Sequence, residues 1–422
     1  MQEEIIEALK GLSKDYYGAN YYDDREADAA AEVVMNQSPF RYYGNYHGMK
    51  ALKVEEKARN IFGTKYAHCV NSGTGALSCA LHALDVTIGD EVLIPGYFWC
   101  AVANAVIQRG AYPVLCEVDE SLNIDINDLK KKITEKTKCL IMIHMDGSPA
   151  EIDSLVKICK EHNISILEDF SQRIGGSYKG KKIGSFGDVS IASLQVNKLI
   201  TAGEGGLILT KSEEIYQKVM ARSDCGLARE ENENNEKYIT IGEGRRFGEI
   251  GAAIIDIQLD RIPYMLEQLR KNKAYIKNML GDISPIQYRK HAFEEGEIAT
   301  ALILQFPSKK DVNEIMDLYQ KEFEHDELHL YRLENFGCHI YYNCQNLIRK
   351  TEALPGGWPW NLATEEYSYE KGTLKKADGL FERTIAMKLP GNISEEQVRA
   401  IGIALRELIS KYMEKWRYKK DE

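Results

Sequence analysis

The sequence predicts an α/β protein with a mostly parallel central β-sheet, followed by a smaller α+β domain. Short apolar runs recur from about residue 50 to 210, and stretches with helical spacing separate the earlier ones. With 44% hydrophobic residues, the 422-residue chain can bury a large core. Its length suggests two or three domains. We expect a large domain over residues 1–265 and a small C-terminal domain over residues 266–422.

Seven apolar runs are the predicted strands of the sheet. They cover residues 67–70, 92–94, 113–116, 139–143, 164–167, 189–192 and 207–209. Residues 76–84 and 152–162 have the spacing of amphipathic helices. Because strands that alternate with helices form parallel sheets, and because ligands bind at the carboxyl ends of such strands, we expect functional residues there.

The remaining elements are predicted from local signals. The N-terminal MQEEIIEALKGL is acidic, with apolar residues at helical spacing, so a short helix is expected rather than a secretory signal. Residues 226–248 are charged and contain glycines, which indicates an exposed loop that can include a short hairpin. Residues 250–267 are predicted to be helical, residues 355–361 to form a loop, and Ser394 to cap the last helix.

Composition excludes several classes of partner. The formal net charge is -10, and an acidic surface repels nucleic acid and anionic lipid. Nine cysteines without a CxxC pair indicate free thiols in a reducing cytoplasm and argue against a zinc site, so no metal is expected. The sequence contains no apolar run of about 18 residues, which argues against a membrane span.

Two motifs that follow predicted strands suggest a site for an anionic ligand. In NSGTGAL, residues 71–77, small residues and the Thr74 hydroxyl can surround a phosphate at a helix N-terminus. A plain tight turn is an equal alternative for this motif. ILEDFSQ, residues 166–172, ends a strand in Glu168 and Asp169, although an aspartate there is as often a helix cap.

A third motif, SLQVNKLITAGEGG at residues 193–206, places Lys198 among apolar residues and glycines. A lone loop lysine is usually solvated, but a desolvated lysine has a lowered pKa and can act as a nucleophile. A phosphate cradle, a carboxylate and a lysine are together the requirements of pyridoxal phosphate (PLP). The cradle anchors the phosphate of PLP, the carboxylate pairs with its pyridinium nitrogen, and the lysine forms its imine.

The order SGTxAL, ED-x-x-Q, S-x-Q-x-x-K and GEGG resembles the DegT/DnrJ/StrS family of sugar aminotransferases. The resemblance is clear over about residues 50–265, where residues 118–138 and 177–190 also match, and it weakens toward the C-terminus. It implies the fold of PLP-dependent transferases of fold type I, which is that of aspartate aminotransferase. It also implies a homodimer with active sites at the subunit interface.

The resemblance implies a role for each matching residue. Lys198 would form the imine with PLP and act as general acid and base. Asp169 would pair with the pyridine nitrogen, and Gln172 would donate a hydrogen bond to the phenolic oxygen. Trp99 would stack on the ring, with core packing as its alternative. The phosphate would be held by Gly73, Thr74, Gly75 and Ser193.

Two positions refine this expectation. Family members that dehydrate sugars have histidine in place of Lys198, so the lysine favours amination. The family's N-x-R element is replaced by IGEGRRFGE, with Gly244 at the asparagine and Arg246 at the arginine. A hydrogen bond to a charged group contributes roughly 1.5–3 kcal/mol, so the loss of the asparagine weakens PLP binding unless Arg245 or Arg246 compensates.

The resemblance implies glutamate or glutamine as amino donor and a ketone on a sugar or cyclitol as acceptor, including nucleotide-linked sugars and octulosonates. Candidate substrate contacts are Arg41, Tyr42 and Tyr43, with surface packing as the equal alternative, and Arg383. Two other functions stay open: a PLP-dependent sugar dehydratase or lyase, and a non-catalytic sensor with this fold. A nicotinamide enzyme is disfavoured because GxGxxG is absent.

Overall fold

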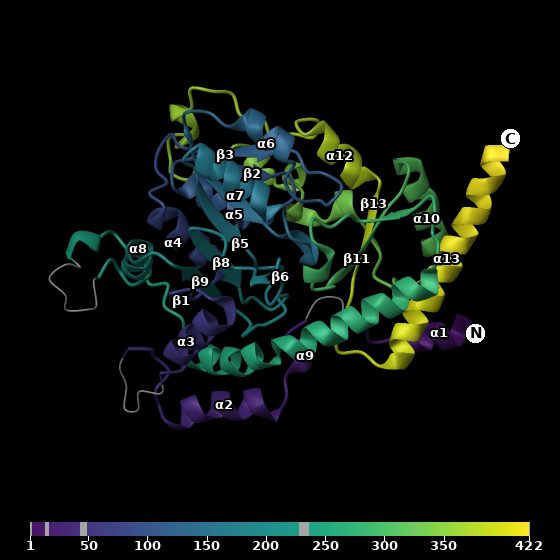
Figure 1. The fold of residues 1–422 in the computed structure, drawn as a ribbon, viewed down its shortest axis with the longest axis horizontal. Helices are drawn as coiled ribbons and strands as arrows, with labels where there is room; N and C mark the ends of the chain where they lie inside the picture. Colours follow the sequence, from purple (N-terminus) through teal and green to yellow (C-terminus); the bar gives the residue numbers. More distant parts are fainter. Residues whose placement is uncertain (1, 13–16, 43–48, 228–235, 324, 422) are drawn as a thin grey trace.

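The computed structural model describes residues 2–12, 17–42, 49–227, 236–323 and 325–421. It contains a seven-stranded sheet between two layers of helices and a separate four-stranded sheet (Figure 1). Helices α1 (Gln2–Leu9) and α13 (Glu395–Asp421) lie beside the smaller sheet, on the side away from α8 (Glu213–Ser223).

The large sheet has the strand order β1-β9-β8-β5-β4-β2-β3. Strand β9 is antiparallel to both of its neighbours, and the other neighbouring strands are parallel. This confirms the predicted mostly parallel sheet, and each strand overlaps one of the seven predicted runs. The strands are β1 Tyr66–Val70, β2 Glu91–Pro95, β3 Tyr112–Cys116, β4 Thr137–Ile143, β5 Ser165–Asp169, β8 Val189–Ser193 and β9 Gly206–Thr210.

Both faces of this sheet are buried, which explains why its strands are nearly continuous apolar runs. Side chains alternate between the two faces along a strand. In β2, Val92 and Ile94 belong to one core cluster, whereas Leu93 belongs to the other. Strand β5 follows the same rule with Leu167 on one face and Ile166 on the other.

Helices between residues 50 and 223 cover the large sheet. Helix α4 begins three residues before its predicted start, because Ser72 caps it: the Gly75 N–H donates to Ser72 Oγ at 3.0 Å. These helices are α3 Lys50–Phe62, α4 Gly73–Ala83, α5 Ala101–Gln108, α6 Ile126–Lys132, α7 Ile152–Glu161 and α8 Glu213–Ser223. A small hairpin, β6 Ser177–Tyr178 with β7 Lys181–Lys182, lies between β5 and β8 in the chain.

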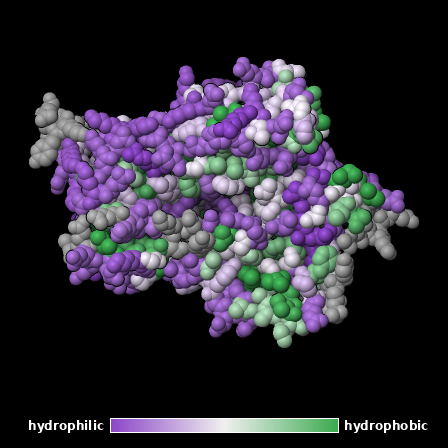
Figure 2. Space-filling model, turned by 180° about the vertical axis from the view of Figure 1, so that it is seen from behind, coloured by the Kyte–Doolittle hydropathy of each residue, from purple (hydrophilic) through white to green (hydrophobic). Residues whose placement is uncertain are grey.

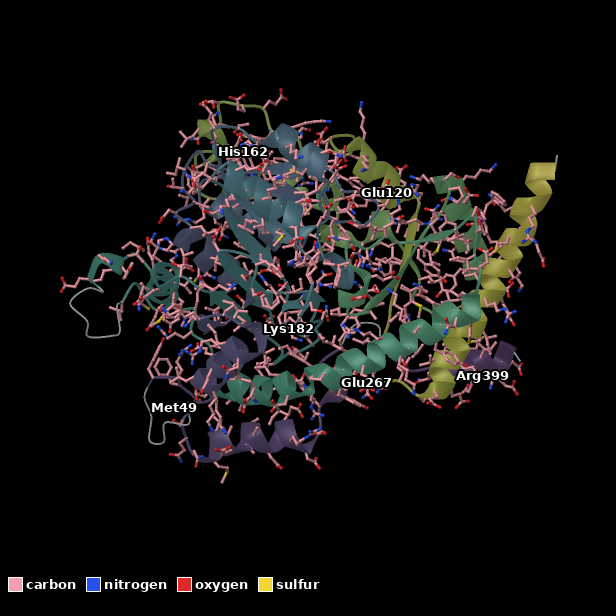
Figure 3. All side chains as sticks on the ribbon, viewed as in Figure 1. Met49, Glu120, His162, Lys182, Glu267 and Arg399 are labelled. Carbon is pink, nitrogen blue, oxygen red and sulfur yellow. The ribbon has the colours of Figure 1, made fainter. Side chains whose placement is uncertain are left out.

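Helix α9, Glu249–Leu280, is 32 residues long and connects the two parts of the molecule. It continues past residue 267, where the sequence pattern placed its end, and the expected domain boundary after residue 265 falls inside it. Helix α2, Asp24–Met35, packs along its first half, and α13, Glu395–Asp421, packs against its second half. Figure 3 labels Glu267 on α9 and Arg399 on α13.

The smaller sheet is antiparallel, with the order β10-β11-β13-β12. Its core is shared with helix α1, which packs on α13. The strands are β10 Gln287–Tyr288, β11 Ala301–Gln305, β12 Tyr331–Arg332 and β13 Thr384–Lys388. Helix α1 Gln2–Leu9 and helix α10 Lys309–Glu322 contribute to this core, whereas side chains of α11 Gln345–Ile348 and α12 Lys375–Glu382 belong to the core cluster that includes the large sheet.

Residues 333–374, which we call the bridging segment, leave the smaller sheet and pack on the β2–β3 end of the large one. The N–H of Phe98 donates to the carbonyl of His339 at 2.9 Å, and the Tyr341 N–H donates to the carbonyl of Gly96 at 3.2 Å. The hydroxyl of Tyr369 donates to the carbonyl of Pro113 at 2.8 Å. The two sheets therefore share one core cluster.

Among the helices of the described residues, none has the length and apolar character needed to cross a membrane. Figure 2 shows hydrophobic residues in separate patches on an otherwise mostly hydrophilic face.

Candidate active site

A cavity of about 440 Å³ lies where the carboxyl ends of β4, β5 and β8 meet the bridging segment. Its volume is in the range of sites for cofactors and small substrates. Residues from both sheets line it. Seven of the predicted site residues are brought together here: Gly73, Thr74, Trp99, Asp169, Gln172, Ser193 and Lys198.

One end of the cavity is the N-terminus of α4. The first helical hydrogen bond there runs from the Ala76 N–H to the Ser72 carbonyl at 2.9 Å, so the N–H groups of Gly73 and Thr74 precede it. A Cβ added to Gly73 would lie 2.6 Å from the Ser193 Cβ, so only glycine fits against that strand end. These features fit an anion held by backbone N–H groups, such as the phosphate of a cofactor.

Lys198 is on the turn that follows β8 and is partly exposed to the cavity. Its N–H donates to the Gln195 carbonyl at 2.9 Å, and its carbonyl accepts from the Gly18 N–H at 3.0 Å. A Cβ on Gly18 would lie 2.7 Å from the Leu199 carbonyl, so the N-terminal segment packs closely against this turn. Burial of the amine lowers the pKa of Lys198 below its ordinary value.

Asp169 is the last residue of β5 and is buried, with Oδ1 accepting from the Ser171 N–H at 3.0 Å. Burial raises the pKa of this carboxyl group, and the nearby positive charge of Lys198 opposes that rise. A cationic ring nitrogen beside Asp169 would stabilise its charged form in the same way. The pair of Asp169 and Lys198, with the α4 N-terminus beside them, therefore fits a PLP ring with its phosphate.

Glu168 precedes Asp169 and, by strand alternation, points away from the cavity into the protein. Although burial opposes ionisation, hydrogen bonds from His144 and from backbone N–H groups hold the pKa of Glu168 below its ordinary value. Its carboxylate fixes the loop before β8. The donors to it are His144 Nε2, the N–H groups of Gly184, Phe186 and Gly187, and the Ser190 hydroxyl.

Gln172 is oriented by the turn of residues 145–147, which follows β4. The N–H of Asp146 donates to Gln172 Oε1 at 3.0 Å. With its oxygen engaged in this way, the amide NH₂ of Gln172 can donate to an oxygen atom in the cavity. This agrees with the hydrogen bond to the phenolic oxygen that the resemblance implies.

The cavity is also lined by residues that the sequence analysis did not identify, among them Tyr17, Asp146, Phe336, His339 and Lys388. Asp146 follows a strand just as Asp169 does, so the same signal could have found it. The other residues carry no local signal, since Phe336 and His339 come from the bridging segment and Lys388 ends β13.

The aromatic residues of this wall contact one another. The rings of Trp99 and His339 are 4.9 Å apart, and Phe336 stacks on His339 at 4.2 Å. Burial lowers the pKa of His339 to about 3, so its imidazole is neutral at neutral pH.

The remaining predicted residues are not among those that line the cavity. The N–H of Gly75 is engaged by the Ser72 cap. Arg246 forms an ion pair with Asp224, with Nη1 2.6 Å from Oδ1, and its guanidinium lies 5.5 Å from the centre of the Phe40 ring.

The candidate substrate contacts also lie elsewhere in this chain. Arg41 is buried in an ion pair with Glu55, with Nη2 2.9 Å from Oε1, and it lies over the ring of Tyr42. Arg383 donates to the Phe306 carbonyl at 3.3 Å, and it precedes β13, whose opposite end reaches the cavity. Tyr43 lies outside the described residues.

Comparison with known proteins agrees with this geometry. Residues 23–406 match the model of the DegT/DnrJ/EryC1/StrS aminotransferase family. GDP-perosamine synthase from Vibrio cholerae is 34% identical over 241 residues, 57% of this chain and 65% of the synthase. L-glutamine:2-deoxy-scyllo-inosose aminotransferase from Streptomyces fradiae is 30% identical over 278 residues, 64% of this chain and 65% of that enzyme. The match thus covers just under two thirds of the length of each of these two relatives.

A solved structure shares the fold. GDP-4-keto-6-deoxy-D-mannose-3-dehydratase from Escherichia coli, with hydrated PLP bound, has a TM-score of 0.75 and 20% identity, over 94% of this chain and all of that one. The family resemblance, the fold, the aminotransferase class and the cofactor expected from the sequence are therefore confirmed. This chain belongs to the DegT/DnrJ/EryC1/StrS aminotransferase family of PLP-dependent enzymes.

Proposed function

We propose that this protein transfers an amino group from glutamate or glutamine to a ketone on a sugar or a cyclitol. The observation that carries the proposal is the arrangement of Lys198 and Asp169 around one cavity, with the N-terminus of α4 at its end. The names of the two curated relatives support such an acceptor. Lys198 stands where family members that dehydrate sugars have histidine, which favours amination over dehydration.

Each residue has a role in this proposal. PLP, when bound, withdraws electrons from the carbon that carries the amino group. Lys198 holds the cofactor and moves a proton at its Nζ atom, and its lowered pKa favours the neutral amine that accepts protons. Asp169 keeps the ring nitrogen protonated, and Gln172 orients the ring. Gly73, Thr74 and Ser193 hold the phosphate, while Trp99 covers one side of the ring.

We further propose that the protein works as a homodimer, as the resemblance implies. Exposed hydrophobic side chains support a partner surface: Met35 is 80% exposed and Ile241 is 85% exposed. Among the described residues, the atoms nearest to a Cβ on Gly244 belong to the Arg246 side chain, at 3.5 Å, which supports space here for a residue of another subunit. The nine cysteines, all unpaired thiols in described residues, support the expected cytoplasmic location.

The absorption spectrum of the PLP-loaded protein tests this function. We expect the visible band of lysine-bound PLP, and we expect glutamate or glutamine to convert it to the pyridoxamine form. Lys198→Ala should remove the band, because it removes the amine, whereas Lys182→Ala, at an exposed position on β7, should retain it.

Two other outcomes would contradict the proposal. A band that no amino acid changes would favour the dehydratase or lyase, or the sensor. A visible band that persists in Lys198→Ala would show that another amine holds the cofactor.

A further inference from the structure

Two cationic side chains, Lys198 and Lys388, line the cavity among the residues that the structure describes. Under the proposed function, Lys198 is occupied by the cofactor. Lys388 is then the remaining cation, facing a lining that also contains the acidic residues Asp146, Asp169 and Glu204. An amino-acid donor carries a carboxylate on the same carbon as its amino group, so a cation is needed close to the reacting centre.

Lys388 reaches the cavity from the last position of β13, in the smaller sheet. Its ammonium group pairs with Asp146 Oδ1 and lies 5.0 Å from the centre of the Phe336 ring. The side chain is 17% exposed. An ammonium group has three N–H donors and Asp146 accepts from one, so donors are left for a ligand.

Asp146 is itself held in place by its surroundings. Its carboxylate accepts a hydrogen bond from the Tyr97 hydroxyl, and its backbone has a left-handed conformation with φ of 46°. Arg289 donates to the carbonyls of Met145, at 3.2 Å, and of Asp146, at 2.7 Å. Arg173 donates to the carbonyl of Gly147. Two buried arginines thus hold the three carbonyl groups of the turn at residues 145–147. They therefore also hold Asp146, the residue that pairs with Lys388.

Lys388 is the charged group beside this turn that an incoming anion would meet. Arg289 also lies beside Asp146, but it is buried behind the turn and is not among the residues that line the cavity. Although burial opposes its ionisation, these two cations lower the pKa of Asp146 to about 2, so it is charged at neutral pH. Tyr97 and His339 are neutral there, since burial raises the pKa of the first and lowers that of the second. A ligand carboxylate on this side of the cavity would therefore meet the ammonium group of Lys388.

We propose that Lys388 binds a carboxylate group of the substrate and so determines which substrates react. The inference rests on the proposed function and names a subsite of it. The carboxylate belongs either to the amino-acid donor or to an acidic sugar acceptor. Loss of one charge-assisted hydrogen bond corresponds to roughly a 10- to 100-fold loss of affinity.

Calorimetric titration of the PLP-loaded protein with unreactive carboxylates tests this. Glutarate represents the donor skeleton, glucuronate an acidic sugar, and glucose a neutral sugar. We expect Lys388→Met to weaken binding of glutarate or of glucuronate by about 10- to 100-fold and to leave glucose binding unchanged. Lys182→Met, which removes an exposed positive charge on β7, should change neither. If glutarate loses affinity, the carboxylate bound by Lys388 belongs to the amino-acid donor; if glucuronate loses affinity, it belongs to an acidic sugar acceptor.

Two further variants separate ligand binding from a purely structural role. Lys388→Arg keeps the cation and should retain most of the affinity. Lys388→Met combined with Asp146→Asn removes both charges, so it relieves the unpaired carboxylate that Lys388→Met alone leaves buried. If the double variant regained wild-type affinity, Lys388 would act only as the partner of Asp146, and the proposal would fail.

The binding titration can be interpreted independently of the test of the proposed aminotransferase function. Glutarate binding requires no amino transfer, so a wild-type protein that binds glutarate through Lys388 but converts with no amino acid would contradict only the aminotransferase proposal. Equal affinities of wild type and Lys388→Met for both acids, or no binding of either acid by the wild type, would overturn the assignment of Lys388.

Discussion

Gly73 lies so close to Ser193 that a larger residue must move one of them. In Gly73→Ala the new Cβ would begin 2.6 Å from the Ser193 Cβ, at the point where α4 presents its first N–H groups. We expect PLP to bind about tenfold more weakly or worse, with unchanged helix content, because one lost hydrogen bond to a charged group has that effect. Fluorescence titration of the apoprotein with PLP measures it.

The matched control is Gly379→Ala in α12, where no atom of the described residues outside the helix's own backbone lies within 4 Å of an added Cβ. This variant should bind PLP like the wild type and unfold at slightly higher temperature, since alanine favours a helix interior over glycine. Wild-type PLP affinity in Gly73→Ala would show that the turn adjusts without loss.

Single residues at strand ends are where sequence reasoning worked best. Lys198 and Asp169 follow apolar runs that were predicted as strands of the same sheet, and both were expected near the carboxyl ends of those strands because ligands bind there. His339 and Lys388 enter the same cavity from the bridging segment and from β13. Their positions depend on how the two sheets pack, and no local pattern records that. Arg41 is a case in which the local pattern was misleading. An arginine beside tyrosines suggested a substrate contact, whereas in the structure Arg41 forms an ion pair with the buried Glu55.

At the scale of elements, β5 and the loop before β8 depend on Glu168. Its folded pKa is below the ordinary value of 4.5, so its stabilising contribution is present above that pH and is lost as pH falls. Glu168→Gln should lower the free energy of unfolding by about 3–5 kcal/mol at pH 7, because it removes the charge from a buried network. Urea unfolding at pH 7 and pH 4 measures both effects.

The variant should also lose part of the acid dependence that the wild type shows between these pH values. Glu161→Gln, at an exposed position on α7, is the control and should change neither quantity appreciably. A Glu168→Gln protein as stable as the wild type at pH 7 would mean that the five donors find other acceptors.

Element boundaries were predictable where a cap or an apolar pattern marks them and less so elsewhere. The seven strands were found because each is apolar on both faces. The start of α4 was placed too late, since its first turn consists of small residues without an apolar stripe. The length of α9 was underestimated because the helix changes partners along its length, from α2 and α3 to α13. For the loop expected at residues 226–248, residues 228–235 lie outside the described part; the described remainder contains a 3-10 turn at Glu236–Tyr238 and an isolated antiparallel bridge between Asp224 and Gly244.

For the whole molecule, we predict that residues 1–265 do not fold alone. A chain cut after residue 265 would end inside α9 and would lack the bridging segment, whose side chains complete one core cluster of the large sheet. Tyr97 and Phe98 would lose Ile340 and Tyr341 as core neighbours. We expect this fragment to show no cooperative urea transition by circular dichroism, whereas the full chain does. A cooperative transition in the fragment would establish that the large sheet is an independent folding unit.

The cavity wall is built from two separate parts of the chain, and this affects how the substrate specificity of the protein can change. Lys198, Asp169 and the N-terminus of α4 reach the cavity from the large sheet, whereas Phe336, His339 and Lys388 reach it from residues that follow α9. Under the roles proposed above, replacement of residues 336–339 and of residue 388 would change which substrates bind and would leave Lys198 and Asp169 in place. The proposal therefore predicts that evolution or protein engineering can change the substrate of this scaffold while the reaction stays the same.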